Sequence, residues 1–206
     1  MMKSSLVLIF AIICLSASAA YAQKHEVAFT SGGLKIGERG FDLPQPGRLR
    51  FKTGFTYQFN YARRILDGKV AALYFELPLA GTPRTKVEVS NALSPRSYSS
   101  IFFTPGIKLK LLPGLRYSPY VMAGAGLARF NESDTLTNDQ PNADQKSNTD
   151  GVFDFGVGID VRVFSILSIR GEVRDFYSEL PPLNVRALRD RQHNALISAG
   201  FVLRFK

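Results

Sequence analysis

Apolar and polar residues alternate with a period of two along most of this chain. The clearest run spans residues 49–61, where one parity holds Leu49, Phe51, Phe55, Tyr57, Phe59 and Tyr61. The other parity holds small, polar or charged residues. Because successive side chains of a β-strand point to opposite faces, this run predicts a strand with one apolar face and one polar face.

Seven further segments show the same alternation. They predict strands over residues 27–31, 71–79, 100–111, 117–130, 153–163, 167–174 and 195–205. The links after the second, fourth and sixth strands are a few residues long, and two of them contain the turn dipeptides Asp67-Gly68 and Pro113-Gly114. The links after the first, third, fifth and seventh strands have a dozen residues or more. Eight strands with short turns at one end and long loops at the other predict an all-β fold, an eight-stranded antiparallel up-and-down transmembrane β-barrel with short periplasmic turns and long extracellular loops.

The polar face of these segments is rich in glycine and carries charges of both signs. An eight-stranded barrel is only just wide enough inside for side chains, and buried charges need partners there. We therefore predict that this face lines the lumen and that its charged residues form a network: Glu76, Asp160, Arg162, Arg170, Glu172, Arg174 and Arg204. The apolar face then meets lipid. The alternative is a soluble periplasmic barrel whose apolar face points inward and binds a small apolar ligand.

The N-terminus has the pattern of a cleaved secretory signal. Lys3 precedes an apolar run over residues 6–15, and small residues end in Ala20-Tyr21-Ala22. We predict a signal peptide over residues 1–22 and one barrel domain over residues 23–206. The only cysteine, Cys14, leaves with the signal, so disulfides and cysteine metal sites are excluded. With 45% hydrophobic and 21% charged residues, the composition also excludes a helical membrane protein and a disordered chain.

Three segments resemble a known family. They are residues 118–127, with a proline, a tyrosine and spaced glycines; the paired segments 156–160 and 170–174; and residues 199–205, which alternate apolar residues up to Phe205. The chain resembles the small outer-membrane β-barrels of Gram-negative bacteria, the outer-membrane protein A-like and opacity-protein-like group called porin-family barrels. The resemblance implies location in the cell outer membrane and a structural, adhesive or interaction role, with a largely filled lumen and no large pore. It also implies two partners: outer-membrane lipid with lipopolysaccharide, and the outer-membrane assembly machinery, which reads the C-terminal strand.

Some barrels of this size modify lipid A, so an enzyme is a further alternative. That chemistry needs a serine activated by a base, usually histidine. The two histidines are His25 and His193, and Ser198 lies roughly 16 Å along the strand from His193 at about 3.3 Å per residue. We therefore predict no enzyme, no catalytic or metal site and no cofactor. The net charge of +9 is spread without a recognition motif, so we expect no nucleic-acid partner. The sequence does not specify the oligomeric state.

Overall fold

The computed structural model describes residues 24–36, 39–41, 47–89, 94–179 and 191–206. The signal peptide predicted over residues 1–22 lies outside this part of the chain. The described residues form eleven strands: β1 (His25–Ile36), β2 (Arg39–Phe41), β3 (Gly47–Phe51), β4 (Gly54–Leu66), β5 (Ala71–Val89), β6 (Ser97–Phe103), β7 (Gly106–Leu111), β8 (Tyr117–Glu132), β9 (Ser147–Arg162), β10 (Leu167–Glu179) and β11 (Arg191–Phe205). None of these residues belongs to a helix long and apolar enough to cross a membrane.

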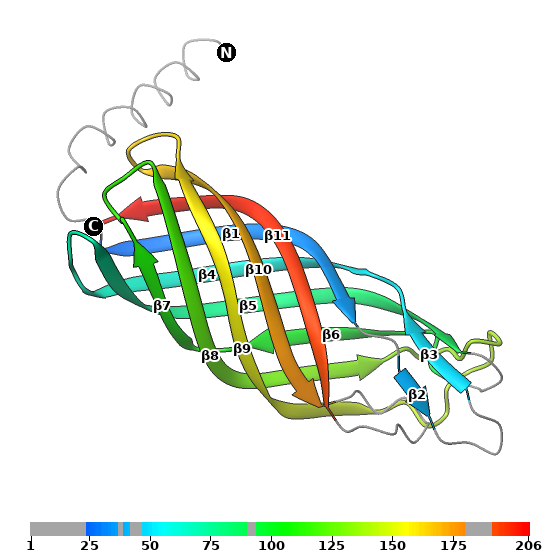
Figure 1. Ribbon diagram of the computed structural model, residues 1–206. Coiled ribbons are helices and arrows are strands. Elements are labelled where there is room, and N and C mark those ends of the chain that lie inside the picture. Colours follow the sequence, from blue (N-terminus) through cyan, green and yellow to red (C-terminus); the bar gives the residue numbers. More distant parts are fainter. Residues whose placement is uncertain (1–23, 37–38, 42–46, 90–93, 180–190) are drawn as a thin grey trace, which may run out of the picture.

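The strands close into an eight-stranded antiparallel barrel, as predicted (Figure 1). β1 closes the wall by pairing with β11 over its whole length, from His25 opposite Phe205 to Ile36 opposite Asn194. β6 and β7 together fill one position in the wall, because both pair with β5 on one side and β8 on the other. β2 and β3 lie outside this ring. β3 pairs with the last residues of β5, and β2 pairs with β3.

Two of the predicted strands are broken. The segment 49–61 divides at Lys52 and Thr53 into β3, which pairs with the far part of β5, and β4, which pairs with β1 in the barrel wall. The break changes the face as well: Phe51 meets Tyr98 edge-on at 6.0 Å, whereas Phe55 is 56% exposed on the outside. A single continuous strand would have put both rings on the same side.

The second break falls at Thr104 and Pro105, between β6 and β7. Proline has no amide hydrogen, so it cannot donate to a neighbouring strand and commonly interrupts a ladder. Other boundaries also differ from the prediction. β5 continues ten residues beyond Leu79 to Val89, and β1 covers twelve residues, whereas the prediction gave the first strand only residues 27–31.

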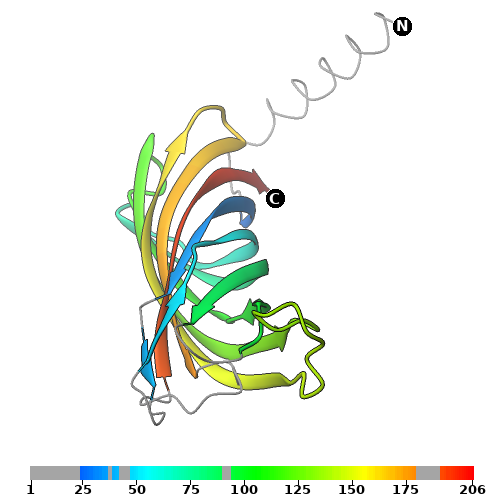
Figure 2. The ribbon, with the colours of Figure 1, turned by 90° about the vertical axis from the view of Figure 1, so that its right-hand side faces the viewer.

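The two ends of the barrel differ in their connections. At one end, which we name the turn end, residues 67–70, 112–116 and 163–166 join neighbouring strands, and the last residue, Lys206, lies there too (Figures 1 and 2). At the other end, the loop end, residues 133–146 connect β8 to β9. Backbone hydrogen bonds tie this connection to the segment before β6, from the Thr137 amide to the Ser94 carbonyl and from the Arg96 amide to the Thr135 carbonyl.

The outer surface carries a continuous apolar band. On β11 the outward side chains Ile197, Phe201, Leu203 and Phe205 are 44–66% exposed, and the other barrel strands show the same exposure of large apolar residues. From residue 195 to residue 205 the strand rises about 33 Å, which a tilt of about 40° reduces to about 25 Å, the height of the lipid-facing band of a membrane barrel. The apolar face therefore points outward, which the soluble-barrel alternative does not allow.

The apolar band generates a stability prediction. Val157 lies midway along the outward face of β9 and is 56% exposed, so Val157→Arg would place a cation in the middle of the hydrocarbon layer. We expect this change to lower the free energy of unfolding by about 2–4 kcal/mol. Reversible urea unfolding in lipid vesicles measures it. Thr149→Arg, on the same face near the loop end, is the matched control and should cost far less; an equal loss in both variants would contradict a lipid-facing band.

Candidate functional site in the lumen

Ten charged side chains on the inner face are joined by ion pairs into one cluster, which we name the lumenal ion network. Each is at most 5% exposed. Its members are the acids Glu26, Glu76, Asp154, Asp160 and Glu172 and the bases Lys108, Lys110, Arg170, Arg174 and Arg204. Five bases and five acids give a formal charge of 5 − 5 = 0. The ten charges of the network therefore balance one another.

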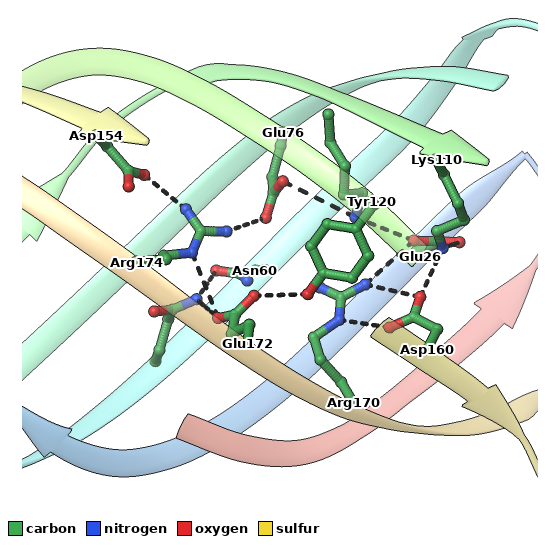
Figure 3. Close-up of polar contacts among 12 residues, drawn as sticks. Glu26, Asn60, Glu76, Lys110, Tyr120, Asp154, Asp160, Arg170, Glu172 and Arg174 are labelled. Carbon is green, nitrogen blue, oxygen red and sulfur yellow. Dashed lines mark hydrogen bonds and ion pairs between the residues drawn. The ribbon is translucent and has the colours of Figure 1, made fainter. Parts of the chain in front are cut away.

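Arg174 on β10 is the centre of one half of the network (Figure 3). Its guanidinium donates from Nη1 to Asp154 at 2.6 Å, from Nη2 to Glu76 at 2.5 Å and from Nε to Glu172 at 3.3 Å. These three carboxylates come from β9, β5 and β10. A guanidinium holds its donors in a fixed planar fork, so one Arg174 side chain ties distant strands together in a defined geometry.

The other half of the network surrounds Asp160. Arg170 donates to both of its oxygens, from Nε to Oδ1 at 2.8 Å and from Nη2 to Oδ2 at 3.1 Å. Lys110 bridges Asp160, at 2.6 Å, to Glu26, at 2.5 Å. Lys108 then links the halves, because its Nζ lies 3.1 Å from Glu26 and 3.9 Å from Glu76.

Tyr120 fills the space between the two halves. Its hydroxyl donates to Glu172 at 2.8 Å, and the guanidinium carbon of Arg170 lies 4.8 Å from the centre of its ring. The ring lies over Gly158, the residue paired with it on β9, and a Cβ there would come within 2.4 Å of the tyrosine ring. This contact leaves no room for a side chain at position 158 while the Tyr120 ring stays where it is.

Six of the seven sequence-predicted network residues lie in the cluster: Glu76, Asp160, Arg170, Glu172, Arg174 and Arg204. The structure places Arg162 elsewhere. Its guanidinium donates to the carbonyl oxygens of Pro113 at 2.9 Å and Gly114 at 3.0 Å, at the turn end. β9 ends at Arg162, so this side chain lies beyond the enclosed part of the inner face.

Four members of the network are absent from the sequence prediction. Lys108, Lys110 and Asp154 fall on the parity assigned to the polar face, so the pattern contained the signal for them. Glu26 lies one residue before the first predicted strand. It could be found only by extending that strand to His25, where β1 begins.

Toward the loop end the inside of the barrel contains a cluster of large apolar side chains, which the alternation did not predict. A cluster of buried side chains, which we name the aromatic layer, includes Leu34, Tyr98, Phe102, Phe130, Val152 and Phe176. Phe102 stacks on Phe176 with ring centres 4.6 Å apart and meets Phe130 edge-on at 5.8 Å. The cue in the sequence is the consecutive run Ile101-Phe102-Phe103, which makes both faces of that strand apolar.

The histidine and serine considered for catalysis lie on opposite faces of β11. The side chain of His193 is 62% exposed outside the barrel, where Nδ1 lies 2.5 Å from Asp175. Ser198 is buried in the lumen, with its hydroxyl 3.3 Å from that of Thr30. The other histidine, His25, lies 2.7 Å from the Tyr61 hydroxyl. In the part of the chain that the structure describes, no group of three or more His, Cys, Asp or Glu side chains is arranged to hold a metal ion.

Removing the central guanidinium tests the network. Arg174→Met leaves the three carboxylates around it without their shared cation, and we expect the free energy of unfolding to fall by about 3–5 kcal/mol, the cost of breaking a buried ion pair from one side. Urea unfolding in vesicles measures the change. Arg162→Met is the matched control, because that side chain is partly exposed outside the network, and it should cost much less. A loss below about 1 kcal/mol for Arg174→Met would contradict the assigned role.

Known proteins share the fold of this chain at low sequence identity. No family model and no curated protein matches the sequence. Among solved structures, Neisserial surface protein A has a TM-score of 0.58 at 14% identity, covering 88% of this chain and 97% of that one. OprG from Pseudomonas aeruginosa has a TM-score of 0.54 at 10% identity, covering 91% and 99%. Ail, the attachment invasion locus protein of Yersinia pestis, has a TM-score of 0.50 at 15% identity, covering 88% and 100%. The chain shares the fold of these small outer-membrane β-barrels, which is the fold that the resemblance in the sequence implied.

Proposed function

We propose that this outer-membrane barrel has a structural, adhesive or interaction role and does not act as a pore. The observation that carries the proposal is the filling of the lumen by two successive layers, the lumenal ion network and the aromatic layer. The charged side chains are held by one another, and the rings beyond them contact one another directly. A small barrel closed in this way leaves its rims and outer surface for contact with other molecules.

The loop end supports a role in contact with other molecules. β5 is 19 residues long and, with β3 and β2, forms a ribbon that projects from the barrel wall (Figure 1). Exposed ion pairs lie here, with Lys52 and Glu88 2.7 Å apart on the ribbon and Arg96 paired with Asp139. Backbone hydrogen bonds hold the connection over residues 133–146 against the segment before β6. Ail, which is named for attachment, shares the fold.

The closed lumen predicts the electrical behaviour of the protein. Reconstituted into planar bilayers, the refolded chain should give no large stable conductance, because the buried charges of the lumenal ion network and the rings of the aromatic layer occupy the lumen at two successive levels. Single-channel recording after insertion, verified by heat-modifiable migration on gels, is the measurement. A reproducible step of the size seen for trimeric porins would contradict the proposal.

We also propose that the barrel is not an enzyme. The support is the separation of His193 and Ser198 on the two faces of β11, together with the hydrogen bond between His193 and Asp175. We expect His193→Ala to leave the acylation pattern of lipid A unchanged in cells that express the protein, as read by mass spectrometry. A pattern that appears with the wild-type chain and disappears with His193→Ala would overturn this proposal.

The proposed partners follow from the surface of the barrel. The apolar band fits the acyl chains of outer-membrane lipid and lipopolysaccharide. β11 presents alternate apolar side chains up to Phe205, which fits the proposed reading of the C-terminal strand by the outer-membrane assembly machinery; Lys206 follows this phenylalanine.

A further inference from the structure

The turn end carries an excess of positive charge outside the lumenal ion network. Outside the network, the described residues of this end include seven basic side chains and one acidic side chain, Asp67. The basic residues are Lys24, Arg63, Arg64, Lys69, Arg116, Arg162 and Lys206. The loop end is different, because acids such as Asp134, Asp144 and Glu179 are mixed among its cations. The excess therefore belongs to one rim and not to the whole protein.

Three of these cations line one pocket on the outer surface. The pocket has a volume of about 550 Å³ and is lined by Lys24, Arg63, Arg64, Ile65, Asp67 and Phe75. Arg64 is already engaged, because it donates to the Tyr74 hydroxyl at 3.0 Å and to Asp67 at 3.0 Å. Among the described residues, neither Lys24 nor Arg63 has a carboxylate within ion-pair distance. Their charges are available to an anion from outside.

The strand register places this pocket at the edge of the apolar band. Arg63 faces outward in one row with His25 on β1 and Phe75 on β5. The next outward residue on β4 toward the loop end is Tyr61, whose hydroxyl lies 2.7 Å from His25. A tyrosine with a polar tip is typical of the level where hydrocarbon gives way to headgroups. Arg63 lies one strand repeat, about 7 Å, beyond that level.

The turns beside the pocket are amphipathic. Leu66 and Phe164 are each 64% exposed, and Val70 is 70% exposed, in the turns or at the strand ends beside them, where Lys69 and Arg162 also lie. Exposed apolar side chains interleaved with cations are typical of surfaces that lie within a lipid headgroup layer. The turn end is therefore suited to rest in the bilayer interface.

We propose that Lys24 and Arg63 bind the phosphate of an anionic phospholipid in the leaflet at the turn end. The exposed side chains of Ile65 and Phe75 line the same pocket and meet the glycerol and the first part of the acyl chains. Charge complementarity selects an anionic lipid, and the position at the edge of the apolar band selects a membrane lipid over a free anion. The proposal rests on the membrane-spanning barrel proposed above.

Lipid retention in nanodiscs tests this site. The full barrel is reconstituted in phosphatidylcholine with and without phosphatidylglycerol, and heat-modifiable migration first verifies that it is folded and inserted. Native mass spectrometry then measures the phosphatidylglycerol that stays bound on release from the disc. We compare wild type with Lys24→Gln/Arg63→Gln. The matched control is Lys35→Gln/Arg129→Gln, which removes two exposed outward cations from the opposite half of the barrel.

The turn-end variant should bind phosphatidylglycerol roughly tenfold more weakly than wild type, because each cation near an anionic surface adds to the affinity. The loop-half control should bind as wild type does. Retention that is equal in wild type and the turn-end variant, or lost only in the control, overturns the lipid site. A chain that does not insert would instead contradict the membrane-spanning barrel, so the two failures are distinguishable.

Discussion

The rest of the structure depends on the narrowness of a closed eight-stranded barrel. With eight strands the inner side chains meet across the lumen, so each buried charge must find its partner among the others. The lumenal ion network meets this demand with five acids and five bases, and Arg174 alone joins carboxylates from three strands. Gly158 is small because the Tyr120 ring occupies its space. A closed wall of eight strands therefore requires that the buried charges inside it pair with one another.

The same constraint decides where the barrel can act. Charged side chains occupy its interior on the turn side, and packed aromatic rings occupy it on the loop side. The two rims are the surfaces that remain for contact with other molecules. At the loop end, the ribbon of β5, β3 and β2 and the connection over residues 133–146 project from the wall. At the turn end a basic, partly apolar rim faces the headgroups. The outer band between them holds the protein in lipid.

Alternation along the sequence predicts which face a residue occupies, and this suffices for the eight-stranded fold and for six of the charged lumen residues. It does not predict which residues meet. Arg174 and Glu76 are separated by 98 positions, and only the register of the strands and the closure of the wall bring them together. Alternation also does not predict the two strand breaks, at Lys52-Thr53 and at Thr104-Pro105. It does not reveal the aromatic layer, because near the loop end the outward neighbours of the buried apolar residues include Lys35, Arg129 and Asp175, which reverses the pattern of the mid-barrel.

The barrel interior is held together by buried charges that pair with one another. A double-mutant cycle on Arg174 and Glu76 tests it most directly, with Arg174→Met, Glu76→Gln and the double variant unfolded by urea in the same vesicles. We expect a coupling free energy of about 2 kcal/mol or more, because the two groups lie 2.5 Å apart and are both buried. Strictly additive losses, with a coupling below about 0.5 kcal/mol, would contradict it.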